Sequence, residues 1–302
     1  MRICSLLPSA TEIAYAIGLG DSILGVSHEC DFPAEAATKP ALLRPRVDPA
    51  APPVEIDRLV SEIIARGESI YAVDVELLAS LSPDLILTQD LCHVCAASPD
   101  DLAAALTRFP RQPQVLSLTP RSLDEVWGDI RRVGEATGRR GKAEALATAL
   151  EQRVAEIAEI TSRAGSRPRV LCLEWLDPYY VGGHWVPEMV DKAGGEDVLG
   201  SLRQPSFRVT ADEILQSRPD VIVVMPCGYG LVRARTECDA ALFPEGWKGL
   251  PAVRESRIFA VDANSYFSRP GPRLADGVAL LAYLLHPDLF PSKFPANAHH
   301  RR

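Results

Sequence analysis

The apolar positions between residues 142 and 162 repeat with the period of a helix. Leu146, Leu150, Val154 and Ile157 lie on one face of such a helix, and acidic residues occupy the other faces. A helix of roughly 21 residues is about 30 Å long, the width of a small domain. We interpret this segment either as an ordinary surface helix or as a spacer between two lobes. The pattern of strands and helices on either side of it decides between these two interpretations.

Short apolar runs alternate with helical patterns before this segment. The predicted strands are residues 2–7, 23–27, 69–71, 85–88 and 115–118. The predicted helices are one capped by Ser9 or Thr11 and others at 54–66, 75–81 and 100–109. Residues 34–53, rich in Ala, Pro and Arg, are expected to form an irregular loop. Alternating strands and helices predict a mainly parallel sheet covered on both faces.

The same pattern restarts after the helical stretch 123–162. Arg169–Leu173 resembles the opening strand, a loop is expected over 174–185, and a helix follows from about Pro187. The clearest repeat is ELLASLSPDLILTQ (76–89) against EILQSRPDVIVVMP (213–226). We therefore predict two Rossmann-like α/β lobes with mainly parallel sheets, bridged by one long α-helix. The predicted boundaries are an N-terminal lobe 1–120, a helical linker 121–165 and a C-terminal lobe 166–302.

Composition narrows the class of protein. The chain has 302 residues, of which 47% are hydrophobic and 24% charged, as in a globular protein with a substantial core. Its net charge of −8 disfavours nucleic-acid binding, and it contains no apolar run long enough to span a membrane. The N-terminus predicts a strand and a helix rather than a signal peptide. As given, the chain is expected in the cytoplasm, or in the periplasm or another extracytoplasmic site if an export signal was removed.

Two short segments contain residue types that bind metals. These are Cys92-His93-Val94-Cys95 and His28-Glu29-Cys30. One CxxC pair is only half of a zinc site, and a c-type haem motif needs the histidine after the second cysteine. Three interpretations stay open: a metal held by the protein, a ligand that brings its own metal, and packing alone. We expect packing, with no metal or cofactor of the protein's own.

Enzyme motifs are absent from the sequence. There is no Gly-rich phosphate loop, no GxSxG elbow and no HExxH pair. We expect no catalysis. The alternative is a metal-dependent enzyme or metal-binding protein that uses the Cys92–Cys95 loop.

The loops after the predicted strands are the candidate binding site. In parallel α/β sheets, ligands bind beyond the carboxyl ends of the strands. These loops collect many aromatic residues, which suit a broad, partly apolar small molecule. The aromatic residues are Trp175, Tyr179, Tyr180, Trp185, Tyr229, Tyr266 and Phe267. The non-aromatic candidates from the same loops are Ser9, His28, Glu29, Gln89, Cys92 and Arg269.

Several long segments resemble the cobalamin-binding proteins of ABC importers, in the periplasmic-binding-protein family with a helical backbone. The segments are SLLPSATEIAYAIGLGDSILGVSHECDFP (5–33), DKAGGEDVLG (191–200), SYFSRPGPRLADGVALLAYLL (265–285) and the two Pro-Asp turns. The resemblance implies two lobes bridged by a rigid helix, with the ligand in the cleft. It implies ligand contacts at Glu29, Tyr71, Gln89, Trp175, Ser206 or Phe207, and Arg269.

The resemblance also implies a ligand and a partner. The ligand is expected to be a corrinoid such as cobalamin, a related tetrapyrrole or a metal chelate. The partner is an ABC transporter permease, contacted through Glu76 on one lobe and Asp212 or Glu213 on the other. A remaining alternative is a pair of lobes used only for protein contact.

Overall fold

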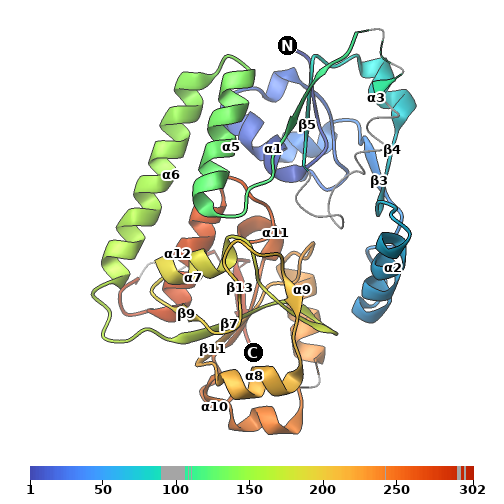
Figure 1. The fold of residues 1–302 in the computed structure, drawn as a ribbon. Coiled ribbons are helices and arrows are strands. Elements are labelled where there is room, and N and C mark those ends of the chain that lie inside the picture. The colour runs from blue at the N-terminus through green and yellow to red at the C-terminus, as the bar shows by residue number, and fades with distance from the viewer. Residues whose placement is uncertain (90–105, 108, 110, 242, 291–293, 296) are drawn as a thin grey trace. The chain divides into compact units, whose positions relative to one another are not determined.

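The computed structural model describes residues 1–89, 106–107, 109, 111–241, 243–290, 294–295 and 297–302. The chain divides into two compact units. Unit 1 contains Met1–Pro120 and Glu125–Thr148, and unit 2 contains Arg121–Asp124 and Ala149–Arg302. The long helix α6 (Arg140–Thr161) begins in unit 1 and ends in unit 2 (Figure 1). The prediction of two α/β lobes bridged by one long helix is thereby confirmed.

The apolar stripe of α6 is buried as the sequence pattern predicts. Leu150, Val154 and Ile157 are each less than a tenth exposed, whereas Glu144 and Glu159 lie on exposed faces. The helix α5 (Leu123–Ala136) precedes it, and a Cβ added at Gly134 would meet the Ala143 side chain. The small residue at position 134 therefore lets α5 and α6 approach closely.

Unit 1 is built on a four-stranded parallel sheet with the order β2-β1-β5-β6. Its strands are β1 (Ile3–Ser5), β2 (Ile23–Val26), β5 (Leu85–Thr88) and β6 (Gln114–Ser117). The helices α1 (Pro8–Ala16) and α3 (Val75–Leu81) connect them. Every residue of β1 and β5 is buried, which is typical of central strands covered on both faces.

The helix α1 begins at least two residues earlier than a cap at Ser9 or Thr11 would require. Pro8 is its first residue and Leu7 precedes it without any side-chain cap, so the prediction of an N-cap at Ser9 or Thr11 is wrong. Proline fits the first helical position because its fixed φ is already helical and its missing N–H would have no partner there. The Thr11 hydroxyl instead donates to Ser5 Oγ, at 2.8 Å, inside the unit.

A two-stranded antiparallel ribbon carries the helix α2 (Pro53–Ala65). The ribbon pairs β3 (Leu43–Pro45) with β4 (Tyr71–Val73). The prediction of an irregular loop over 34–53 is therefore wrong for β3 and for a short 3-10 helix at Ala34–Thr38. A three-residue strand that ends in a proline is too short to show an alternating pattern, and only its pairing with β4 identifies it.

Unit 2 contains a larger, mixed sheet. Its order is β10-β8-β7-β11-β12-β13, with β9 beside β7. The parallel strands are β7 (Arg169–Leu176), β9 (Glu196–Asp197), β11 (Val221–Val224) and β12 (Ile258–Val261). The antiparallel pairs are β7 with β8 (Tyr179–Val181), β8 with β10 (Phe207–Arg208), and β12 with β13 (His299–Arg301).

The expected loop at 174–185 is largely a β-hairpin. Strand β7 continues through Trp175 to Leu176, and β8 returns beside it after Asp177-Pro178. The loop prediction is wrong there because aromatic residues were assigned to a binding loop, although they also favour strands.

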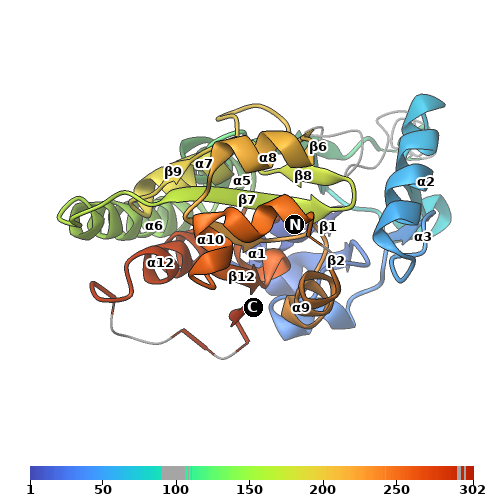
Figure 2. The same ribbon diagram turned by 90° about the horizontal axis from the view of Figure 1, so that it is seen from below.

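Helices and a short 3-10 helix cover the sheet of unit 2. They are α7 (Val186–Lys192), α8 (Ala211–Ser217), α9 (Leu231–Ala240), η3 (Glu245–Gly249), α10 (Pro251–Arg254), α11 (Ala263–Tyr266) and α12 (Leu274–Leu285). Helices α8 and α12 lie on opposite sides of β7 (Figure 2). Both helices bury apolar residues, so the sheet has a hydrophobic layer on each face.

The repeated sequence forms the same corner in both units. Helix α3 is followed by the C-cap residue Ser82 and helix α8 by the C-cap residue Arg218, both in the left-handed conformation, with φ of 43° and 44°. A Pro-Asp pair follows in each case, and then the central strand β5 or β11. The two corners lie 136 positions apart throughout, as the aligned Pro83 and Pro219 predict.

An arginine at the start of the first strand closes each corner. In unit 1 the Arg2 amide donates to Asp84 Oδ2 at 2.8 Å, and its guanidinium donates to the Leu81 carbonyl at 2.7 Å. In unit 2 the Arg169 amide donates to Asp220 Oδ2, and its guanidinium to the Ser217 carbonyl, both at 2.9 Å. The resemblance between the openings of the two lobes therefore reflects a shared network of hydrogen bonds.

Candidate functional site

Three predicted site residues meet at the carboxyl edge of the unit 1 sheet. His28 and Glu29 follow β2, and Tyr71 is the first residue of β4. The His28 and Tyr71 ring centroids are 5.3 Å apart, and the Tyr71 hydroxyl donates to Glu29 Oε1 at 3.4 Å. His28 Nε2 lies 4.0 Å from the same carboxylate oxygen. The cluster offers a ring surface, one imidazole and one carboxylate.

The His28 imidazole is half-buried. Burial lowers the pKa of His28, and the nearby Glu29 carboxylate opposes that shift. A lowered pKa keeps the imidazole neutral near pH 7, with a lone pair on one ring nitrogen. Nδ1 is buried and has no hydrogen-bond partner among the residues that the structure describes. The ring can therefore accept a hydrogen bond or bind a metal carried by a ligand.

The other unit 1 candidates lie apart from these contacts. Ser9 lies in the first turn of α1 and is only 2% exposed. Gln89 directly follows β5 and is partly exposed. Cys92, His93 and Cys95 lie outside the described residues, so the metal-dependent alternative that depends on them stays a hypothesis.

Two predicted residues pack together at the carboxyl edge of the unit 2 sheet. Trp175 lies near the end of β7, and Tyr229 in the loop after β11. Their ring centroids are 5.2 Å apart with an interplanar angle of 58°. The Tyr229 side chain is buried, at 4% exposure, and burial raises the pKa of Tyr229 to about 12. Its hydroxyl therefore stays protonated and can donate a hydrogen bond.

Arg233 was not identified from the sequence. It lies on α9, with its guanidinium carbon 3.9 Å from the centroid of the Tyr229 ring. A cation above an aromatic face is attracted by the ring quadrupole. The spacing of four residues between Tyr229 and Arg233 at the start of a helix was the available signal.

The hairpin β7–β8 and strand β10 place further candidates nearby in the chain. The Tyr179 ring centroid is 5.2 Å from that of Trp247, and burial raises the pKa of Tyr179. Phe207, on β10, is 39% exposed. Ser206 donates a short hydrogen bond to the Glu174 carboxylate, which fixes the loop before β10 to the end of β7.

Of the remaining three candidates, Trp185 directly precedes α7, Tyr266 is the last residue of α11, and Arg269 follows α11. Trp185 is buried, and its indole N–H donates to the Phe267 carbonyl at 2.8 Å. Tyr266 and Arg269 are partly exposed, and burial raises the pKa of Tyr266. A ligand role for these three residues stays a prediction.

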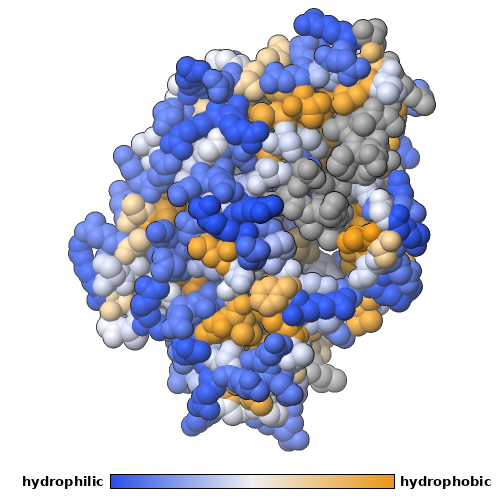
Figure 3. Space-filling view, in the orientation of Figure 1, coloured by the Kyte–Doolittle hydropathy of each residue, from blue (hydrophilic) through white to orange (hydrophobic). Residues whose placement is uncertain are grey.

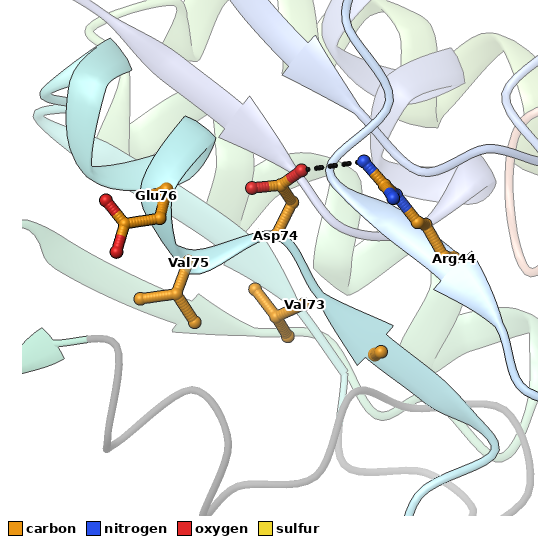
Figure 4. Close-up of a pocket in the computed structure, with 6 residues that line it drawn as sticks. Arg44, Val73, Asp74, Val75 and Glu76 are labelled. Atoms are coloured by element: carbon orange, nitrogen blue, oxygen red, sulfur yellow. Dashed lines mark hydrogen bonds and ion pairs between the residues drawn. The ribbon is translucent and has the colours of Figure 1, made fainter.

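One pocket of about 330 Å³ lies in unit 1 beside the ribbon (Figure 4). It is lined by Arg44, Ala72, Val73, Asp74, Val75 and Glu76. Arg44 and Asp74 form an ion pair at 3.1 Å, and the exposed Glu76 lies in the first turn of α3. The pocket therefore includes the predicted transporter-contact residue rather than the His28 cluster.

A second pocket of about 380 Å³ lies in unit 2, where the Phe243 and Trp247 rings stack 5.0 Å apart. On the face in Figure 3, apolar surface occurs in separate patches among hydrophilic residues. In the described part of the chain, no group of three or more His, Cys, Asp or Glu side chains could hold a metal ion. No helix in that part is long and apolar enough to cross a membrane.

Comparisons with known proteins place these sites in context. A curated relative, the Bacillus subtilis "Uncharacterized ABC transporter substrate-binding lipoprotein YvrC", is 29% identical over 96% of this chain and 81% of its own length. The Vibrio cholerae "Vitamin B12-binding protein" is 24% identical over 92% of this chain and 86% of its own. The fold is similar to that of the apo periplasmic heme-binding protein RhuT from Roseiflexus sp. RS-1, with a TM-score of 0.71 and 23% identity, covering 95% and 98% of the two chains.

A family-wide profile provides the broadest match. The profile described as "Periplasmic binding protein" matches residues 3–265, which include the sheet of unit 1, every strand of the unit 2 sheet except β13, the helix α6 and the two aromatic clusters. The match covers most of the 302 residues. The chain therefore belongs to the periplasmic binding protein family.

Proposed function

We propose that this chain is the substrate-binding protein of an ABC importer and binds a corrinoid or a related tetrapyrrole without changing it chemically. The observation that carries the proposal is a pair of contacting rings at the carboxyl edge of each sheet: His28 with Tyr71 in unit 1, and Trp175 with Tyr229 in unit 2. Rings provide broad contact area at low entropic cost, which suits a flat macrocycle.

The names of the relatives support this class of ligand. One is a vitamin B12-binding protein and another a heme-binding protein. Both ligands are wide, partly apolar rings that carry a metal. A corrinoid and heme are both candidates for this chain, because the half-buried His28 could face the metal of either ring.

The experiment is a titration of the purified chain with cobalamin, cobinamide and hemin, followed by tryptophan fluorescence and visible absorbance. We expect at least one ligand to quench fluorescence with a Kd in the micromolar range or tighter. The Trp175→Phe variant should lose most of the quenching, whereas Trp127→Phe, altered at the one tryptophan of unit 1, should keep it. If none of the three ligands changes either signal, the tetrapyrrole proposal fails.

The partner in this proposal is a permease reached through one carboxylate on each unit. Helices α3 and α8 have the same length and follow caps at Asp74 and Thr210, so Glu76 corresponds to Asp212, the second residue of α8. Glu213 is already engaged, because its carboxylate accepts from the Thr210 amide at 2.7 Å in a capping box. We therefore assign the second contact to Asp212, and place the protein outside the cytoplasmic membrane, where an importer takes up its ligand.

A further inference from the structure

Two neighbouring rings of unit 2 each carry a buried polar atom without a hydrogen-bond partner in the described part of the chain. Trp175 Nε1 and the Tyr229 hydroxyl are inaccessible to solvent, and neither has a hydrogen-bond partner among the residues that the structure describes. Nearly all buried polar groups in native proteins are paired, and leaving one unpaired costs about 1–3 kcal/mol. The rings that carry these two groups are 5.2 Å apart, which indicates that a bound molecule supplies the missing hydrogen-bond partner.

The missing group must be an acceptor. An indole N–H can only donate, and it has no lone pair available for hydrogen bonding. A tyrosine hydroxyl can donate or accept, but the Trp175 N–H still needs an oxygen. A single carboxylate or carbonyl oxygen, or two oxygens of one carboxylate, would satisfy both donors.

The local charge favours an anion over a neutral acceptor. The Arg233 guanidinium lies 3.9 Å from the centroid of the Tyr229 ring, and the ten-residue helix α9 begins at Leu231, two positions after Tyr229. A cation and the positive end of a helix dipole both stabilise negative charge. Glu237 opposes this effect, because its Oε1 forms an i,i+4 ion pair with Arg233 Nε at 3.9 Å. The thiol of the exposed Cys227 lies on the same loop.

We propose that Trp175, Tyr229 and Arg233 form a subsite that binds a carboxylate of the ligand. This inference rests on the proposed function, because it gives the orientation of the bound macrocycle. The edge of the macrocycle that carries carboxylates lies against unit 2. It implies a preference for a tetrapyrrole with free acid side chains over one whose acids are blocked as esters or amides.

The first test separates the subsite from the rest of the ligand. Propionate and propionamide are titrated against the purified chain while tryptophan fluorescence is followed. We expect propionate to quench with at least tenfold higher affinity than propionamide, and the response to disappear in Trp175→Phe. Equal responses would overturn the carboxylate assignment, and no response to either would mean that water alone fills the place.

The second test uses variants and a matched pair of macrocycles. Hemin should bind at least tenfold more tightly than its dimethyl ester, and Tyr229→Phe and Arg233→Gln should each reduce this ratio to near one. Arg233→Lys, which keeps the charge, should restore part of it. Thermal unfolding of each variant shows whether the fold is retained. Equal binding of acid and ester by the wild-type chain would overturn the inference while leaving the proposed function intact. If no macrocycle binds but propionate still binds more tightly than propionamide, the carboxylate subsite is supported and the proposed function fails.

Discussion

Asp197 is a buried carboxylic acid with an incomplete set of partners. Its Oδ1 accepts from the amides of Leu199 and Gly200, at 3.1 and 2.6 Å, whereas Oδ2 is buried without a partner among the described residues. Burial raises the pKa of Asp197 to about 6, although the two amide hydrogen bonds oppose that shift. The residue ends β9 and begins the loop that leads toward Ser206 and β10.

This raised pKa makes stability depend on pH in a definite direction. Between pH 4 and 6 the folded chain keeps the Asp197 proton while the unfolded chain loses it, so the free energy of unfolding falls as pH rises through this window. The Asp197→Asn variant keeps the acceptor oxygen and removes the ionisation. We expect it to be about 2 kcal/mol more stable than the wild type at pH 7.5, and about equal at pH 4.

Urea unfolding at pH 4 and pH 7.5 measures this difference. The control is Asp212→Asn, at an exposed position of α8. If the wild type has the higher free energy of unfolding at pH 7.5, the prediction is wrong and the ionised Asp197 carboxylate stabilises the folded chain.

The repeated corner is the element that both units share. Asp220 accepts from the Arg169 amide and is partly buried, whereas Asp84 accepts from the Arg2 amide at an exposed position. Loss of one such hydrogen bond costs about 1 kcal/mol, and more where the unpaired donor is buried.

We therefore expect Asp220→Ala to lower the free energy of unfolding by about 1–2 kcal/mol, and Asp84→Ala by less. Trp127 is the one tryptophan of unit 1, and the other three belong to unit 2. Urea unfolding followed in single-tryptophan backgrounds can therefore assign each loss to its unit. Equal losses of unfolding free energy in the two variants would mean that burial does not determine how much each aspartate contributes to stability.

The sequence predicted elements whose signal is local. The apolar period of α6, the Pro-Asp corners, and strands such as Leu85–Thr88 all depend on neighbouring residues. It failed at β3, whose three residues become a strand only by pairing with β4, and at the β7–β8 hairpin. The same difference between local and distant signals applies to the candidate site. His28 and Glu29 were found at a strand end, but their contact with Tyr71 joins positions more than forty residues apart, and only the resemblance suggested Tyr71.

At the scale of the whole molecule, the proposed transporter contact depends on two surface carboxylates. We expect the double variant Glu76→Lys, Asp212→Lys to bind its ligand with unchanged affinity. Its ability to stimulate the ATPase of the cognate permease complex should fall at least tenfold, because both ion pairs would become repulsive.

The matched control is Glu213→Gln, one position along α8. It weakens the capping box and should lower stability by about 1 kcal/mol, but it should leave ATPase stimulation unchanged. Loss of stimulation in Glu213→Gln, with none in Asp212→Lys, would reverse the assignment of the second contact.

The division of the chain between the units has a consequence for synthesis on the ribosome. Unit 1 includes Glu125–Thr148, which carries the buried Trp127, Ile130 and Val133 of α5 and the first turns of α6. The first 120 residues therefore cannot complete their core as they emerge, and they must wait until about half of the chain has been made. An arrest of translation before residue 148 would expose the apolar surface that α5 covers, so nascent chains of this protein should need chaperone protection over that interval.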